Sequence, residues 1–187
     1  MIKEFGSLFA GYPHIENVGF AGKPVRERFY SNDHLITAFD ATLAVAESMD
    51  AAGYDVLWMA EHHFQREGDE GITNIPLLSL YLAQHTERIK FGAAFNVPPM
   101  WHPLRLAEDF ATADILTDGR VTFGVGRGYH AREVETFGAP LLDQPANRDL
   151  FEEQVNIIFK AFNERRFSYH GQYYNLPPKV PYRGYEL

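Results

Sequence analysis

Two imidazoles and a carboxylate follow one another in Glu61-His62-His63-Phe64, directly after the apolar stretch DVLWMA at residues 55–60. Histidine titrates near neutral pH, so this segment could transfer protons in catalysis. It could also bind a metal ion, or its histidines could be hydrogen-bonded structural side chains. Neighbouring residues on an extended strand point to opposite faces, so His62 and His63 cannot easily reach one ion. This geometry disfavours a metal site and leaves proton transfer and structural packing open.

A second unusual segment, residues 92–96 (GAAFN), has small side chains near the end of another apolar stretch. Small side chains would let a flat ligand lie against the backbone. They also suit the tapering interior of a barrel, and without other evidence this packing explanation is favoured.

A third segment, residues 124–128 (GVGRG), places Arg127 between two glycines. Glycine permits close backbone approach, and the planar guanidinium of arginine suits a phosphate group. A strand followed by such a loop is a reasonable phosphate site, and the alternative is a turn with a solvated arginine. The segment is not a G-x-G-x-x-G that leads directly into a helix, so it is weak evidence for dinucleotide binding.

Four apolar stretches predict the strands that position these segments, at residues 5–9, 55–60, 90–97 and 121–125. Apolar residues at helical spacing, or an early helical proline, indicate a helix after each strand, at residues 35–49, from Pro76, from Pro103 and at residues 151–162. This alternation predicts an α/β fold with a parallel sheet. Ligands bind at the carboxyl ends of parallel strands, where all three segments fall.

Two further stretches are predicted outside this pattern. Residues 13–33 are polar and punctuated by glycine and proline, which predicts a long loop that helps to shape the substrate site. Residues 167–187 predict a hairpin that turns at His170-Gly171, followed by a proline-rich exit at residues 177–181.

The composition excludes several classes of function. The 187 residues carry a net charge of −8 and no basic run, which argues against a nucleic-acid partner. There is no cysteine, which excludes disulfides, thiolate catalysis and cysteine-based metal sites. No stretch reaches the roughly 18 apolar residues of a membrane helix, and the N-terminus lacks a signal-peptide pattern. These features predict a soluble cytoplasmic protein.

Four stretches together resemble the luciferase-like flavin-dependent monooxygenases, the family of bacterial luciferase. They are AEHHF (60–64), FGAAFNVPP (91–99), HPLRLAEDFATADILTDGRVTFGVGRG (102–128) and ETFGAP (135–140), in the family's order and near its spacing. The resemblance implies a TIM-type (β/α)₈ barrel, of which residues 1–187 would be the N-terminal portion with about four βα units. It also implies a reduced flavin, usually FMN, that a separate flavin reductase supplies and that reacts with O₂ to oxidise a small organic substrate such as an aldehyde.

The resemblance assigns roles to individual residues. His62 matches the active-site histidine, proposed as a base that stabilises the oxygenated flavin, and Arg127 matches the arginine that grips the flavin phosphate. Ala94-Phe95 matches a position where the family often has a cis peptide bond under the flavin ring. The remaining candidates for flavin contacts are Glu61, Asn96, Tyr129 and Glu133. For Glu61 and Asn96 the alternative is that they contact the flavin-binding residues and not the flavin itself. Where luciferase has a reactive cysteine this chain has Gly126, so no thiol chemistry is possible there.

Three other functions stay open at this point. An F420-dependent oxidoreductase of the same superfamily would transfer hydride rather than oxygen. A flavin-binding or assembly subunit would keep the fold without turnover. A metal-dependent barrel hydrolase would use His62 and His63.

A complete barrel takes about 250 residues and eight strands, and this sequence predicts half of them. Four strands without further partners would leave open sheet edges, which pair with other chains. We therefore expect either a piece of a longer enzyme, a second half-barrel chain or a homo-oligomer.

Overall fold

The computed structural model describes residues 2–13, 24, 27–67 and 70–177. They fall into two compact units. Unit 1 comprises Met1–Asn96 with Thr112–Gly126, and unit 2 comprises Val97–Ala111 with Arg127–Leu187. Most of the predicted loop at residues 13–33 and the proline-rich exit after Pro177 lie outside the described residues.

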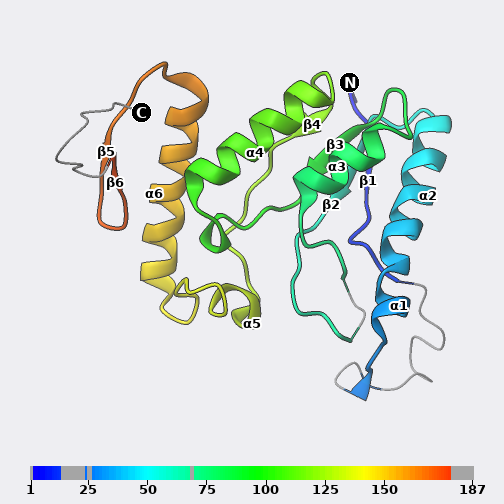
Figure 1. The fold of residues 1–187 in the computed structure, drawn as a ribbon, viewed down its shortest axis with the longest axis horizontal. Helices are drawn as coiled ribbons and strands as arrows, with labels where there is room; N and C mark the ends of the chain where they lie inside the picture. Colours follow the sequence, from blue (N-terminus) through cyan, green and yellow to red (C-terminus); the bar gives the residue numbers. More distant parts are fainter. Residues whose placement is uncertain (1, 14–23, 25–26, 68–69, 178–187) are drawn as a thin grey trace. The chain divides into compact units, whose positions relative to one another are not determined.

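Unit 1 contains a four-stranded parallel sheet in the order β1-β2-β3-β4 (Figure 1). The strands are β1 (Gly6–Leu8), β2 (Val56–Met59), β3 (Lys90–Ala93) and β4 (Val121–Thr122). All four predicted strands are therefore confirmed, each somewhat shorter than its apolar stretch. Apolar strands of a parallel sheet are expected to be buried on both faces, but the three residues of β1 are exposed and those of β4 are only partly buried. As an edge strand, β1 has only β2 beside it in the described sheet.

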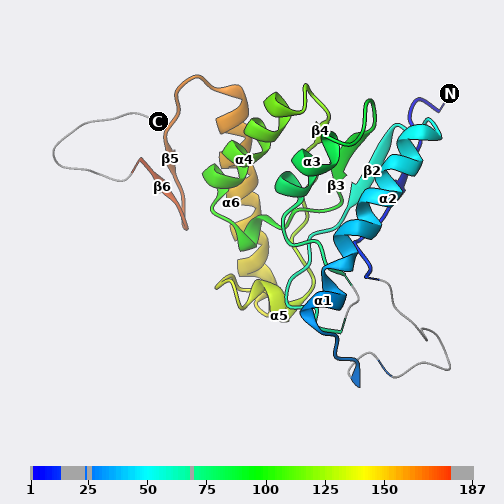
Figure 2. The same ribbon diagram turned by 45° about the vertical axis from the view of Figure 1, so that its right-hand side comes forward.

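Helices alternate with these strands, as predicted. Unit 1 contains α1 (Asn32–Leu35), α2 (Thr37–Ala51) and α3 (Ile75–Ala83), and α4 (Pro103–Leu116) begins in unit 2 and ends in unit 1. Figures 1 and 2 show α2 and α3 running alongside the sheet. The side chain of Asn74 accepts a hydrogen bond from the backbone N–H of Leu77 at 2.9 Å and Pro76 lies in the first turn, which confirms the predicted start of α3.

The core of unit 1 lies between the sheet and these helices, and its strand residues Leu57, Met59 and Phe91 are almost fully buried. Gly92 is part of this packing. A Cβ on Gly92 would lie 2.3 Å from Cε3 of Trp58, so only glycine leaves room for the indole ring. At this position the packing explanation for the small residues is therefore the better one.

Unit 2 consists of the 3₁₀ helix η2 (Pro98–Met100), the first turns of α4, the helices α5 (Ala131–Val134) and α6 (Gln144–Asn163), and a hairpin. The hairpin strands β5 (Tyr169–His170) and β6 (Asn175–Leu176) are antiparallel, which confirms the predicted hairpin. The turn lies between them at residues 171–174, slightly later than predicted.

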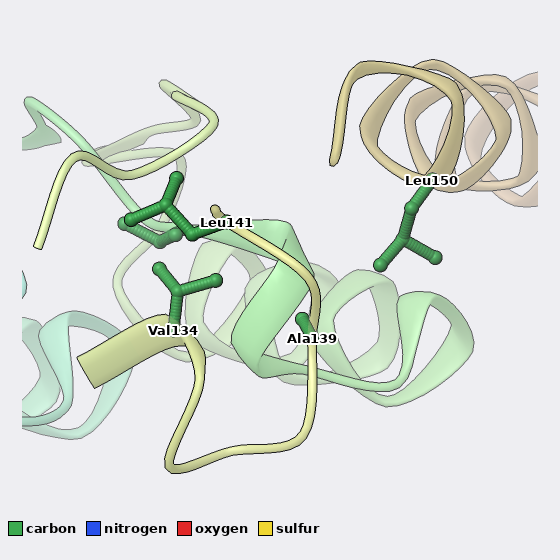
Figure 3. Close-up of a cluster of buried hydrophobic side chains, with 5 residues drawn as sticks. Val134, Ala139, Leu141 and Leu150 are labelled. Carbon is green, nitrogen blue, oxygen red and sulfur yellow. The ribbon is translucent and has the colours of Figure 1, made fainter. Parts of the chain in front are cut away.

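A small hydrophobic cluster holds unit 2 together (Figure 3). Its buried members are Val97, Val134, Ala139, Leu141 and Leu150, with Met100, Ala131 and Tyr174 packed against them. In Figure 3 the side chains of Val134 and Leu141 face each other, and Leu150 reaches toward the cluster from α6. No helix in the described part of the chain is both long and apolar enough to cross a membrane.

Candidate active site

The carboxyl ends of β2, β3 and β4 are joined by hydrogen bonds that continue past the strands themselves. The backbone N–H of Ala94 donates to the carbonyl of Met59 at 2.7 Å, and that of Glu61 donates to the carbonyl of Phe95 at 3.2 Å. On the other side, Asn96 donates to Gly124 at 3.0 Å and Gly126 donates to Asn96 at 2.9 Å. Three predicted segments, around residues 61, 95 and 125, therefore lie together at one edge of the sheet.

His62 pairs with a carboxylate at this edge. Its Nε2 lies 2.7 Å from Oε2 of Glu70, and the two side chains are only 7% and 20% exposed. The backbone N–H of His62 donates to the carbonyl of Ile72 at 2.8 Å, which ties the strand end to the segment that carries Glu70. An imidazole in contact with a carboxylate is an arrangement that suits proton transfer.

His63 pairs with a different carboxylate. Its Nε2 lies 3.1 Å from Oε1 of Glu61, and Nδ2 of Asn96 donates to Oε2 of Glu61 at 2.8 Å. Glu61 is 1% exposed and Asn96 is fully buried, so two buried polar groups satisfy each other. The two imidazoles are thus directed to separate carboxylates. Burial of Glu61 favours a supporting role over direct contact with a flavin edge.

The side-chain oxygen of Asn96 has no hydrogen-bond donor among the described residues. Because Nδ2 must face the carboxylate of Glu61, the orientation of the amide is fixed and Oδ1 points elsewhere. Oδ1 is buried, and no group among the described residues donates to it. Such an acceptor is uncommon in a folded protein and marks a place where a further donor would be favourable.

The segment before Asn96 passes close to the glycine-rich segment after β4. The peptide bond between Ala94 and Phe95 is cis, as the resemblance implied, and the Phe95 side chain is 56% exposed. A Cβ on Gly124 would lie 2.0 Å from the carbonyl oxygen of Ala93, and one on Gly126 would lie 3.2 Å from the ring of Phe95. The two glycines therefore permit one backbone segment to lie against another, which is the close approach that their positions predicted.

The second segment of unit 2 begins with Arg127, the first of three further predicted flavin contacts. Arg127 is partly buried, and no hydrogen bond or ion pair to its guanidinium is found within the described ranges. Tyr129 is 72% exposed, and Glu133 is 3% exposed on α5. The flavin contacts assigned to these three residues stay predictions.

Sequence reasoning missed Glu70. It lies on the loop after β2, where no periodic pattern or motif marks it, and only the distance to His62 identifies it. The only signal in the sequence was that three acidic residues, Glu67, Asp69 and Glu70, follow the histidine pair within ten positions, which is too common a pattern to single out Glu70.

A parallel sheet that alternates with helices, with a histidine–carboxylate pair where its strands end, defines an α/β protein of the kind that binds ligands at the strand ends. Residues 22–184 match the family described as luciferase-like monooxygenase, and the chain belongs to this family.

Two relatives illustrate the family. The oxygenase component of the flavin-dependent trigonelline monooxygenase of Acinetobacter baylyi is 27% identical over 140 residues, which are 74% of this chain and 38% of the relative. The alkanal monooxygenase beta chain of Photorhabdus luminescens is 31% identical over 134 residues, which are 71% of this chain and 40% of the relative. The chain thus spans about two fifths of the length of these proteins.

Solved structures support the fold. One is the oxygenating constituent of 3,6-diketocamphane monooxygenase from Pseudomonas putida, solved in complex with FMN. It superposes with a TM-score of 0.73 at 24% identity, and the match covers 100% of this chain and 47% of the other chain. An F420-dependent secondary alcohol dehydrogenase superposes with a TM-score of 0.63 at 22% identity, and the match covers 73% of this chain and 42% of the dehydrogenase chain. The four βα units therefore match half of a luciferase-like TIM barrel, as predicted.

Proposed function

We propose that this chain is the flavin-binding half of a monooxygenase that uses reduced FMN and O₂ to oxidise a small organic substrate. The observation that carries the proposal is the 2.7 Å pair between His62 and Glu70 at the edge where three strand ends meet. Membership of the luciferase-like monooxygenase family supports the reaction class. In this proposal a separate flavin reductase supplies the reduced flavin; one similar protein is an oxygenase component and another is an oxygenating constituent.

Each unit taken by itself offers groups whose chemistry suits a part of a flavin mononucleotide. In unit 1, Phe95 offers an exposed aromatic ring beside small residues, and Asn96 has a buried acceptor without a described donor. In unit 2, Arg127 offers a guanidinium without a described partner, which suits a phosphate. The backbone N–H of Tyr129 and the carboxylate of Glu133 are further candidate contacts from unit 2. When bound, the reduced flavin would supply the two electrons that O₂ needs.

The protein's own contribution would be a positioned proton. His62 carries an imidazole, a common acid–base group in catalysis, and its Nε2 lies 2.7 Å from the carboxylate of Glu70. Its low exposure keeps bulk water away from the ring. Glu61 and His63 would hold the same segment in place through their mutual contact and through Asn96.

Oxygen uptake with reduced FMN tests this function, with the His62→Ala variant beside the original chain. We expect His62→Ala to slow oxygen uptake about 100-fold, the lower end of general acid–base catalysis, while FMN affinity stays unchanged. His85→Ala, which removes an exposed imidazole at the end of α3, is the control and should leave uptake unchanged. Normal uptake by His62→Ala would remove this residue from catalysis.

An F420-dependent oxidoreductase is the second candidate, favoured by the structural similarity to an F420-dependent dehydrogenase. Titration of the chain with FMN and with F420, followed by flavin fluorescence, distinguishes the two. Tighter binding of F420 would replace the monooxygenase proposal. Flavin binding without oxygen uptake would instead indicate a binding or assembly subunit.

The partner of the sheet is also a proposal. β1 and β4 are the first and last strands of the described sheet, so each has one unpaired edge there. A second half-barrel chain, a further copy of this chain or the rest of a longer protein would cover such edges. Size-exclusion chromatography tests this, and a monodisperse 21.3 kDa monomer with full FMN affinity would contradict it.

A further inference from the structure

We infer that Glu70 is the positioning residue for His62: the Nε2–H group of the imidazole donates a hydrogen bond to the carboxylate of Glu70, so that His62 exchanges protons through Nδ1. The inference rests on the proposed function, because it concerns the residue to which that function assigns proton transfer. It is carried by the distance of 2.7 Å between Nε2 of His62 and Oε2 of Glu70.

The chemistry of the pair fixes the role of each ring nitrogen. An ionised carboxylate only accepts hydrogen bonds, so the imidazole nitrogen that faces Glu70 must carry a hydrogen. In the neutral imidazole the other nitrogen, Nδ1, then carries the lone pair. A histidine whose tautomer and ring orientation are fixed by a carboxylate is a more effective base than one that rotates freely.

The backbone around Glu70 is held firmly enough for this role. The next residue, Gly71, donates its N–H to the carbonyl of Gly11 at 2.9 Å, and Ile72 accepts from His62 at 2.8 Å. Gly11 has a φ of +73°, and a Cβ there would lie 2.5 Å from Cγ1 of Ile72. Two hydrogen bonds and a tight glycine contact therefore fix the segment directly after the carboxylate.

The environment separates this pair from an ordinary surface ion pair. Exposed ion pairs contribute little free energy because water and salt screen the attraction between their charges. Here both side chains are mostly shielded, and a hydrogen bond to a charged acceptor is stronger when water is largely excluded. The carboxylate of Glu61 contacts a different imidazole, that of His63, and the amide of Asn96.

The variants Glu70→Gln and Glu70→Ala test the inference on the complete chain. Gln keeps the size and one acceptor oxygen but loses the charge, and Ala removes the acceptor. We expect oxygen uptake with reduced FMN to fall about tenfold in Glu70→Ala and less in Glu70→Gln, with an unchanged KM for FMN. Glu47→Gln, which alters an exposed carboxylate on α2, should behave like the original chain.

A measurement that needs no flavin accompanies the kinetics. In ¹⁵N-histidine-labelled protein, long-range ¹H–¹⁵N spectra should show hydrogen on Nε2 of His62, with slow exchange against water. In Glu70→Ala this hydrogen should exchange rapidly, whereas Glu47→Gln should leave it protected. A protected Nε2–H that survives Glu70→Ala, or a hydrogen on Nδ1 in the original chain, would overturn the inference.

The combined outcomes keep the two proposals apart. Slow uptake by His62→Ala with normal uptake by Glu70→Ala would overturn the role of Glu70 and leave the proposed function intact. Normal uptake by His62→Ala would overturn the catalytic role of His62 and, with it, the positioning role of Glu70 in the reaction.

Discussion

Gly171 leaves the space that the carboxylate of Glu153 occupies: a Cβ on Gly171 would lie 2.2 Å from Oε1 of Glu153. This carboxylate, on α6, accepts backbone N–H hydrogen bonds from Gln172 at 2.9 Å, Tyr173 at 3.1 Å and Tyr174 at 2.7 Å. Glu153 is 8% exposed, so the hairpin turn is built around a largely buried negative charge.

Glu153→Gln should therefore destabilise unit 2. The amide keeps one acceptor oxygen but turns an NH₂ group toward backbone donors, which leaves N–H groups without a partner. Hydrogen bonds to a charged group contribute about 1.5–3 kcal/mol, so we expect the free energy of unfolding to fall by roughly 2 kcal/mol in urea titrations. The exposed neighbour Glu152→Gln is the control, and equal stability of the two variants would contradict the role of the carboxylate.

Arg120 ties the start of β4 to the end of α3. Its guanidinium donates to the carbonyls of Ala83 at 2.6 Å and Thr86 at 3.0 Å, and its Nε donates to the carbonyl of Thr117 at 3.2 Å. Lysine has a single ammonium group and cannot reproduce this geometry. We expect Arg120→Lys to lower the free energy of unfolding by about 2 kcal/mol.

The control for Arg120 is Arg105→Lys. Arg105 is exposed and, among the described residues, its ion pairs are with Glu108 and Asp109 on its own helix, so this change should cost less than about 0.5 kcal/mol. If denaturant titrations gave the two variants the same loss, the bridge between β4 and α3 would not contribute to stability.

The sequence predicts the strands and helices well because apolar periodicity reflects burial directly. It predicts less about which side chains meet. Phe39 and Phe162 fit the helical spacing but are 39% and 41% exposed. Periodicity identifies the apolar face of a helix, but it does not show how much of that face another part of the chain covers. The pairs His62–Glu70 and Glu153–Gly171 join residues from loops or from distant elements, and such contacts depend on tertiary geometry that no local pattern encodes.

Asp50 provides a prediction about pH. Its carboxylate accepts backbone N–H hydrogen bonds from Glu87, Arg88 and Ile89 at 2.8, 3.1 and 2.8 Å. Burial alone would raise the pKa of Asp50, but the three N–H groups and the charge of Arg88 together lower it below its usual 3.8. Because the folded pKa lies below the unfolded one, these bonds stabilise the fold fully above that value and lose their effect as the pH falls through the folded pKa.

We therefore expect Asp50→Asn to be less stable than the original chain at pH 7, with the difference shrinking as the pH falls below about 4. Urea titrations at several pH values measure it. Glu47→Gln, an exposed carboxylate on the same helix, serves as the comparison and should show little difference at any pH. If Asp50→Asn lowered the free energy of unfolding by the same amount at every pH, the charge of Asp50 would not contribute to stability and only the shape of the side chain would matter.

Arg127 allows the proposed cofactor to be tested through its phosphate. Riboflavin has the same ring as FMN but no phosphate, so a guanidinium that grips the phosphate contributes to FMN affinity alone. A charge-assisted hydrogen bond of about 1.5–3 kcal/mol corresponds to a loss of about 10- to 100-fold in FMN affinity for Arg127→Ala, with riboflavin affinity almost unchanged. Fluorescence titrations with both flavins measure this, and Arg105→Ala, which removes an exposed guanidinium, is the control. Equal losses for the two flavins would assign Arg127 to the folding of the segment after β4 instead of to the phosphate.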